Sequence, residues 1–381
     1  MDLARAQSLL GGLTAAQFMR VHWQKKPLLV RGAIADPLPG IDRRRLFALA
    51  ARDDVESRLV VDDDDRWSVR RGPIPRRALP PIAKPGWTLL VQGVDLHDDS
   101  AHALLGRFRF LADARLDDAM ISFATDGGGV GPHVDSYDVF LLQTQGRRRW
   151  RVGRVARPRL RDDVPLKMLA GFAPRHEWLL EPGDMLYLPP GWGHEGTAVG
   201  PCITCSIGFR APAVADLASA TLQRLSEFIA DEKMRRGRFN NLYADVDQPA
   251  TARPARIPPS LQRFADAAIE TALRVPRLRR RALGEVLSEP KPGTWFERVE
   301  PGALDGGVAL DRRTRMLYDE DHVFINGESY QASGNDAKLM HRLADERHLN
   351  RADLRRLGAD ARQLLEHWAE AGWCMNRRGH P

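Results

Sequence analysis

The residues that decide the fold are GPHVD at 131–135, followed by GDMLYLPPGWGH at 183–194. In the second stretch an apolar run lies between Gly183 and Pro189, and Pro189-x-Gly191 then marks a tight turn that leads to His194. Short apolar runs bounded by Gly, Pro and Asp recur through the first 212 residues, for example at 27–30, 88–91, 120–123 and 139–142. This spacing predicts an antiparallel β-barrel or sandwich.

Three side chains in these stretches have the composition of a metal site. His133 and Asp135 are two residues apart, so in an extended strand they point the same way and can hold one ion. His194 would then arrive from a partner strand. Two imidazoles and one carboxylate form the facial triad of Fe²⁺ oxygenases, which leaves positions open for a co-substrate and O₂. We predict that His133, Asp135 and His194 are metal ligands and catalytic residues.

Composition places few limits on the function. With 43% hydrophobic and 28% charged residues, the sequence is typical of a water-soluble globular protein, and its 381 residues allow two or three domains. We expect no secretory signal, and no apolar run is long enough to span a membrane. The three cysteines suit a reducing compartment, so we expect a cytoplasmic protein. Cys202 and Cys205 read formally as C-x-x-C, but on a strand they face opposite sides and are expected to pack in the core.

The chain is predicted to have three parts. Residues 1–212 form the β-rich domain, with helices expected at 15–23 and 43–51. Residues 213–288 carry amphipathic helices at 214–233 and 261–287, the second divided by Pro276, and are predicted to form a homodimer. Residues 289–381 contain short strands at 307–310 and 322–328, a hairpin turn at Asn326-Gly327, and helices at 336–345 and 359–371.

The helices and the small hairpin of the third part resemble a winged helix, a module that can read DNA but as often contacts other proteins. Its helices carry no row of Arg, Asn or Gln suited to reading bases, so no sequence-specific nucleic-acid contact is expected. The net charge of +7 favours polyanions or proteins that bind them.

Alternation along the strand after the ligands predicts a buried arginine. The inward positions are expected to continue from Asp135 through Tyr137, before a turn at 144–146 reverses the chain. On the returning strand Trp150 and Val152 should face the core, which would bury Arg148 with them, while Arg147, Arg149 and Arg151 face outward. A buried arginine requires an anionic partner. Either an internal Asp or Glu or the far carboxylate of an organic-acid co-substrate would serve.

Together these features resemble the JmjC-type, 2-oxoglutarate-dependent ribosomal-protein hydroxylases of the cupin superfamily, specifically the bacterial YcfD/RoxA-type arginine hydroxylases. The second stretch has the Gly-x₅-Pro-x-Gly-x₂-His spacing of the second cupin motif. The resemblance covers the whole catalytic domain and, more loosely, the remaining parts. It implies an α+β protein with a double-stranded β-helix (a cupin/JmjC jelly roll), a helical dimerisation segment and a C-terminal winged-helix-like domain. The residues that carry it are His133-x-Asp135…His194, 127–132, 137–140, 146–150, 18–32 and 208–212.

The resemblance also implies the reaction and the cofactors. The expected cofactors are Fe(II), 2-oxoglutarate and O₂, and the expected reaction is hydroxylation of an arginine β-carbon in large-subunit ribosomal protein sixteen. Arg148 takes the position of the family's 2-oxoglutarate-binding arginine. Ala124 departs from the pattern, because related sequences place there a serine hydroxyl that also binds the co-substrate. Ser122 or Thr125 is expected to compensate.

An arginine substrate needs an acid near the mouth of the pocket and an apolar sleeve for its stem. Asp118 is nominated for the guanidinium, and Met120 and Tyr137 for the stem. Two alternatives stay open from sequence. One is a ribosomal-protein histidyl hydroxylase of the same class, and the other is a cupin-type transcription regulator that senses a ligand.

Overall fold

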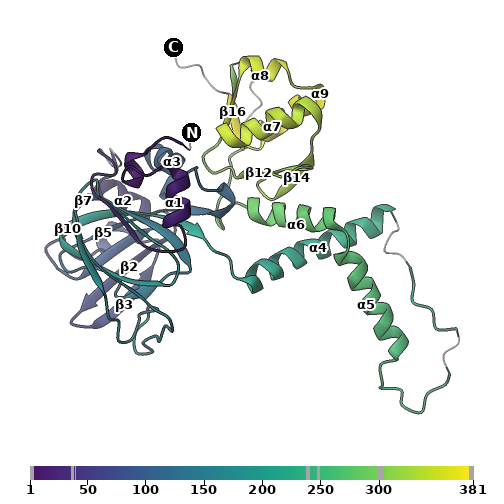
Figure 1. Cartoon of the computed structure of the whole chain (residues 1–381), viewed down its shortest axis with the longest axis horizontal. Coiled ribbons are helices and arrows are strands. Elements are labelled where there is room, and N and C mark those ends of the chain that lie inside the picture. Colours follow the sequence, from purple (N-terminus) through teal and green to yellow (C-terminus); the bar gives the residue numbers. More distant parts are fainter. Residues whose placement is uncertain are drawn as a thin grey trace. The chain divides into compact units, whose positions relative to one another are not determined.

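A computed structural model describes residues 4–35, 38, 40–236, 241–246, 249–298, 304 and 306–376. The chain forms two compact units, Met1–Ala211 and Pro212–Pro381, and each is described below by itself (Figure 1).

The first unit is built on an antiparallel β-sheet, as its apolar runs predict. Its strands are β1 (Leu28–Val30), β2 (Ser57–Asp63), β3 (Arg66–Arg71), β4 (Trp87–Val91), β5 (Leu116–Ala124), β6 (His133–Val134), β7 (Tyr137–Arg154), β8 (His176–Leu180), β9 (Met185–Leu188) and β10 (Trp192–Arg210). They are ordered β1-β9-β7-β10-β5-β4-β2-β3, with β6 beside β10 and β8 beside β7. The long strands β7 and β10 lie side by side and carry most of the site described below.

Three helices belong to the first unit: α1 (Ala15–Val21), α2 (Arg43–Ala50) and α3 (Asp99–Gly106). Each helix is capped at its N-terminus by a side chain that accepts a hydrogen bond from a backbone N–H of the first turn. The capping residues are Thr14, Asp42 and Asp98 respectively. The first two helices confirm the sequence prediction, whereas α3 was not predicted. Short 3-10 helices lie at Ser8–Leu10, Arg76–Ala78, Val94–Leu96 and Asp113–Arg115.

Alternation along β5 separates the main core from the site. Ala119, Ile121 and Phe123 join the large hydrophobic core together with residues of all three helices. Ser122, on the opposite face, contacts the side chain of Arg148. Alternation therefore places Met120 and Ser122 on the face toward Arg148, up to the register shift between Ala119 and Leu116.

The predicted turn at 144–146 is wrong. β7 runs without reversal from Tyr137 to Arg154, and its pairing with β10 shifts register where Gln145 lies opposite Ile203. Gly146 has φ +63°, and a Cβ there would lie 2.2 Å from the carbonyl oxygen of Pro201. The glycine thus marks a β-bulge, which sequence alone does not distinguish from a turn.

This irregularity changes which residues of β7 face inward. Before it, Val139 and Leu141 lie in the same hydrophobic cluster as Trp150 and Val152, which follow it. Odd-numbered residues therefore face this cluster at the start of β7, and even-numbered residues face it at the end. The predicted burial of Arg148, with exposed neighbours on either side, is confirmed.

The second unit begins with three helices, α4 (Val214–Arg236), α5 (Pro259–Leu273) and α6 (Pro276–Ser288). Pro276 stands at the start of α6, so the predicted division of the second helical stretch is confirmed. Leu225 and Phe228 of α4 pack against Ala282 of α6.

The rest of the second unit has two small antiparallel sheets and three further helices. The Asn326-Gly327 turn joins two strands as predicted, with φ values of 49° and 86°. The buried Trp368 lies in the core of this part. The strands are β11 (Gly307–Leu310), β12 (Met316–Tyr318), β13 (His322–Ile325), β14 (Glu328–Gln331), β15 (His348–Asn350) and β16 (Cys374–Asn376), and the helices are α7 (Gly334–Glu346), α8 (Arg351–Arg355) and α9 (Ala359–Glu370).

The two cysteines of β10 and the hydropathy of the helices agree with the predictions from sequence. Cys202 and Cys205 are buried, unbonded to each other, and belong to different hydrophobic clusters, as expected for core residues of a strand. Among the described residues, none of the helices is long and apolar enough to cross a bilayer.

Candidate active site

The two histidines and the aspartate predicted as metal ligands lie together in the first unit. His133 of β6 pairs directly with His194 of β10, and their ring centroids are 4.2 Å apart. Oδ2 of Asp135 lies 3.9 Å from Nε2 of His133 and 3.5 Å from Nε2 of His194. One donor atom from each residue can be chosen so that all three lie within 4.8 Å of one another. This spacing lets a single ion bind all three.

Backbone carbonyls fix the orientation of both imidazoles. Nδ1 of His133 lies 3.0 Å from the Gly131 carbonyl oxygen, and Nδ1 of His194 lies 3.1 Å from that of Trp192. A carbonyl oxygen only accepts hydrogen bonds, so each Nδ1 carries the proton and each neutral ring keeps a lone pair on Nε2. This is the tautomer that a metal ligand needs, and it is set before any metal arrives.

Burial favours the neutral form of His194. Its side chain is 3% exposed, and desolvation, followed by the nearby His133, lowers its pKa to about 4, although Asp135 acts in the opposite direction. His194 is therefore neutral at neutral pH and does not have to lose a proton before it binds a metal.

The other end of the site is formed by Arg148, which is 4% exposed. Its guanidinium donates to the hydroxyls of Ser122 (3.3 Å) and Thr204 (3.4 Å) and to the carbonyl of Gly196 (3.1 Å). All three acceptors are neutral. Burial lowers the pKa of Arg148 below its ordinary value.

Within the described part of the chain, no Asp or Glu lies within ion-pair distance of Arg148. Its Nε is buried and has no hydrogen-bond partner. A buried cation without an anionic partner lowers the stability of the folded protein by on the order of several kcal/mol. The unpaired guanidinium therefore fits an incoming carboxylate, and the alternative of an internal salt bridge is not observed among these residues.

Trp150 and Gly196 lie between the two ends of the site. The Trp150 ring lies 5.9 Å from the His194 ring and 5.3 Å from the guanidinium carbon of Arg148. A Cβ at Gly196 would lie 2.7 Å from Trp150 and 2.8 Å from Nε of Arg148. Only glycine leaves room at this position for both side chains.

A hydrogen-bonded pair that sequence reasoning missed supports Arg148. The Gln143 amide nitrogen donates to the Gln145 carbonyl, so its oxygen faces Thr204 and accepts the threonine hydroxyl proton at 2.9 Å. With its proton committed to Gln143, the Thr204 hydroxyl presents a lone pair to Arg148. These residues are separated in sequence by 56 and 61 positions, so no local motif indicates the pair.

The structure distinguishes the two hydroxyls expected to compensate for Ala124. Ser122 contacts Arg148, as described above. The Thr125 hydroxyl instead accepts from the backbone N–H of Trp87 at 3.2 Å and lies 3.4 Å from the carbonyl of the same residue. Ser122 therefore lies with Arg148, whereas Thr125 holds the end of β4.

The nominated substrate residues lie on β5 and β7. Asp118 is 4% exposed, and its Oδ2 accepts hydrogen bonds from the backbone of Gly93 (2.8 Å) and from the Gln92 amide (3.3 Å). Met120 lies opposite Ser206 of β10, and the pairing of the two strands shifts register between Ala119 and Leu116. Tyr137, at the start of β7, is 39% exposed.

Two parts of the chain match known protein families. Residues 103–217 match the JmjC domain, and residues 266–375 match the ROXA-like winged helix. The ribosomal protein uL16 3-hydroxylase of Escherichia coli strain K12 is 36% identical over 323 residues, which cover 82% of this chain and 84% of that relative. The chain belongs to the JmjC-type ribosomal oxygenases.

Solved structures agree with this assignment. The X-ray structure of E. coli ycfD matches this ribosomal oxygenase with a TM-score of 0.82 at 31% identity, covering 95% of this chain and 98% of that one. The E. coli protein in complex with cobalt and 2-oxoglutarate matches with a TM-score of 0.76 at 30% identity, covering 96% and 99%.

These comparisons confirm the predicted fold, a JmjC jelly roll followed by a winged helix. They also confirm the prediction of an oxygenase over a ligand-sensing regulator. The His-Asp-His cluster and the unpaired Arg148 fit a metal ion and 2-oxoglutarate respectively.

Proposed function

We propose that this ribosomal oxygenase uses Fe(II), 2-oxoglutarate and O₂ to hydroxylate the β-carbon of an arginine in large-subunit ribosomal protein sixteen (uL16). The observation that carries the cofactor chemistry is the buried, unpaired Arg148 in the same barrel as the His133, Asp135 and His194 cluster. The choice of uL16 rests on the E. coli relative, whose name gives that substrate.

His133, Asp135 and His194 would hold the iron through Nε2 and carboxylate oxygens. Bound iron supplies oxidation by O₂, in which one oxygen atom enters the substrate C–H bond and the other enters succinate as 2-oxoglutarate loses CO₂. The contribution of the chain is to fix the donors in advance through the Gly131 and Trp192 carbonyls.

Arg148 would bind the far carboxylate of 2-oxoglutarate. Ser122 supplies a hydroxyl beside the guanidinium where Ala124 offers none, and Thr125, engaged with Trp87, is assigned a structural role in place of the predicted co-substrate contact. Thr204 keeps the guanidinium oriented through Gln143.

Asp118, Met120 and Tyr137 would receive the substrate arginine. Met120 shares a face of β5 with Ser122, which contacts Arg148, and this supports the proposal for Met120. A register shift between Ala119 and Leu116 interrupts the alternation before Asp118, so the proposal for Asp118 rests on its charge. The Asp118 carboxylate favours a cationic guanidinium over a neutral imidazole.

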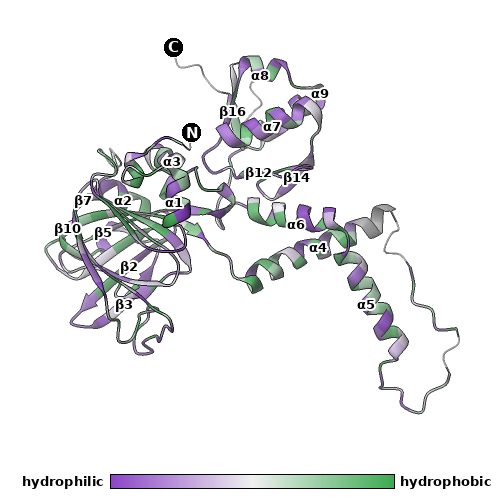
Figure 2. Cartoon of the chain, in the orientation of Figure 1, coloured by the Kyte–Doolittle hydropathy of each residue, from purple (hydrophilic) through white to green (hydrophobic). Residues whose placement is uncertain are grey.

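The oxygenase is further proposed to act in the cytoplasm as a homodimer. Figure 2 shows hydrophobic residues along α5. Exposed apolar side chains on this helix support dimerisation, since Leu261, Phe264, Ile269 and Leu273 are between 37% and 60% exposed. Three unpaired cysteines suit a reducing cytoplasm.

Mass spectrometry of ribosomal proteins from cells with and without the gene tests the substrate. A one-oxygen increase on an arginine of uL16 that disappears with the gene is expected. The same mark on a histidine of another ribosomal protein would contradict the arginine assignment while keeping the hydroxylase.

A pair of variants tests the substrate pocket. Asp118→Asn should lose uL16 hydroxylation while uncoupled conversion of 2-oxoglutarate to succinate continues. Asp117→Asn is the matched control, because Asp117 is the adjacent residue and its carboxylate pairs with Arg210 at 2.7 Å. Equal losses in both variants would contradict the role of Asp118.

A further inference from the structure

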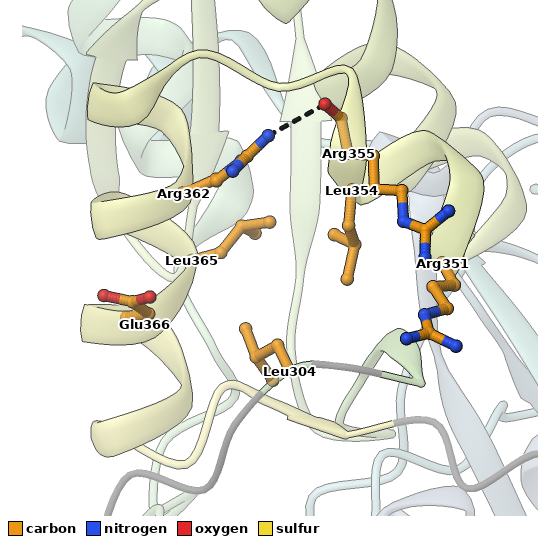
Figure 3. A pocket seen from close by; sticks show the side chains of 7 residues that line it. All are labelled: Leu304, Arg351, Leu354, Arg355, Arg362, Leu365 and Glu366. Atoms are coloured by element: carbon orange, nitrogen blue, oxygen red, sulfur yellow. Dashed lines mark hydrogen bonds between the residues drawn. The ribbon is translucent and has the colours of Figure 1, made fainter.

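The second unit contains a pocket between α8 and α9 that the proposed oxygenase reaction does not use (Figure 3). Its volume is about 270 Å³, and its apolar floor is formed by Leu304, Leu354 and Leu365. Leu354 and Leu365 point toward each other across the pocket in Figure 3. Clefts for whole cofactors measure roughly 300–1,000 Å³. This smaller pocket fits a single aliphatic side chain.

Three arginines surround this apolar floor. Arg351 and Arg355 are four residues apart on α8 and therefore lie on one face of that helix. Arg362 of α9 reaches the C-terminal end of α8 and donates to the carbonyl oxygen of Arg355 at 2.8 Å (Figure 3). The pocket thus combines a concentrated positive charge with an apolar floor.

None of the three guanidiniums has a carboxylate within ion-pair distance among the residues that the structure describes. Other arginines of the same unit do find such partners: Arg342 lies 2.9 Å from Asp353, and Arg313 lies 2.8 Å from Asp311. Exposed Arg356 also lacks such a partner among the described residues, so the pocket is distinguished by the placement of three unpaired guanidiniums around one apolar floor.

The fourth charged group at the pocket is Glu366, which is exposed and forms no ion pair with the described residues. Its negative charge would repel one end of a polyanion laid across the pocket. Contacts to a phosphate backbone also need no apolar floor. An amphipathic ligand, with carboxylates beside an aliphatic group, matches both the three arginines and the leucines.

We propose that this pocket is a binding site for an acidic peptide segment, in which one aliphatic side chain lies on the floor formed by Leu304, Leu354 and Leu365 and flanking carboxylates pair with Arg351, Arg355 and Arg362. The site lies outside the catalytic cluster, so its occupation does not depend on iron or 2-oxoglutarate.

Fluorescence anisotropy with the full chain tests the proposal. The probe is a fluorescein-labelled peptide in which glutamates flank one leucine. Arg351→Ala, Arg355→Ala and Arg362→Ala should each weaken binding about tenfold, because each removes charged hydrogen bonds. Arg356→Ala is the matched control and should leave binding unchanged, since Arg356 is exposed in the same segment but does not line the pocket.

Changes to the probe test the two halves of the pocket separately. A peptide with glycine in place of its leucine should bind more weakly, and one with lysines in place of its glutamates should not bind. Glu366→Gln should strengthen binding of the acidic peptide. All variants should keep wild-type melting temperatures and succinate formation, which separates loss of this site from unfolding or loss of the oxygenase.

Three outcomes would overturn the proposal. The first is failure of the wild-type chain to bind the leucine peptide at millimolar concentration. The second is an equal loss of binding in Arg356→Ala. The third is tighter binding of a labelled single-stranded uridine oligonucleotide, with an affinity that falls steeply as salt rises, which would identify a nucleic-acid surface.

Discussion

Arg148 in the first unit and Arg351 and Arg355 in the second share one property: none has a carboxylate partner among the described residues. They differ in burial, since Arg148 is 4% exposed and the other two are exposed. Water compensates an exposed guanidinium, so pairing there contributes little to stability, at about 0–1 kcal/mol. A buried guanidinium has lost that hydration, and the protein bears the cost until an anion binds.

This difference determines what an unpaired arginine indicates. At Arg148 the absence of a partner by itself predicts an anionic ligand, because the free protein is destabilised without one. For the exposed arginines of α8, the inference of an anionic ligand requires a second observation, which is the apolar floor of the pocket. The variants below separate the two cases.

The largest expected effect comes from the metal ligands. Asp135→Ala and His133→Ala should abolish succinate formation from 2-oxoglutarate, because two donors no longer complete the facial set. The fold should remain, since both residues are partly exposed. Succinate release under air with added Fe²⁺ and the melting temperature are measured together, with His367→Ala, an exposed residue of α9, as control. Retained turnover in Asp135→Ala would contradict the ligand assignment.

The next effect comes from Arg148. Arg148→Ala should weaken 2-oxoglutarate binding about 30-fold or more, corresponding to the roughly 2–5 kcal/mol of a buried charge pair broken on one side. Arg147→Ala, on the exposed face of the same strand, should leave it unchanged. Titration calorimetry on the metal-loaded protein gives both affinities. A larger defect in Arg147→Ala would be incompatible with the observed register.

The cost of burying Arg148 can also be measured on the protein without ligand. Arg148→Met removes a desolvated charge while filling similar space, so the free energy of unfolding should stay equal or rise by about 1 kcal/mol. 2-Oxoglutarate should raise the melting temperature of the wild type by binding the native state, but not that of Arg148→Met. Clear destabilisation of the free variant would mean that Arg148 is already satisfied.

A smaller effect is expected at Thr204. Thr204→Val removes the hydroxyl that joins Arg148 to Gln143, and should weaken 2-oxoglutarate binding about fivefold to tenfold, corresponding to about 1 kcal/mol for one hydrogen bond. Thr204→Ser keeps the hydroxyl and should restore most of the affinity. An equal defect in Thr204→Ser would indicate that the methyl group, and not the hydroxyl, matters here.

Sequence predicted the residues of the site that follow strand periodicity or a fixed spacing. His133 of β6 and Asp135 just after this strand are two residues apart, and His194, which follows the Pro-x-Gly turn, pairs with His133. The burial of Arg148 followed from the position of Trp150 and Val152 on the same face. Each of these inferences uses neighbours only a few residues away.

The rest depends on contacts that are distant in sequence. Thr204 of β10 contacts Arg148 and Gln143 of β7 only because the two strands pair, and no motif joins the three residues. Gly146 indicates a turn as readily as a bulge until the register is known. The sequence also does not distinguish Ser122, which lies in β5 beside Arg148, from Thr125, which follows the strand and contacts Trp87. The helices α3 and α8 were not predicted, although α1 and α2, which are as short as α3, were.

The smallest effect is expected at Arg355, an exposed arginine that is compared with the buried Arg148. Arg355→Met should change the free energy of unfolding by less than about 0.5 kcal/mol, because the Arg355 guanidinium is exposed and remains hydrated without a partner. The backbone carbonyl of Arg355, which accepts the bond from Arg362, is kept in this variant. Chemical denaturation of Arg355→Met and Arg148→Met, each without ligand, places the two changes on one scale. If Arg355→Met stabilised the chain as much as Arg148→Met, repulsion among the pocket arginines, and not desolvation, would be the main cost of an unpaired guanidinium in this protein.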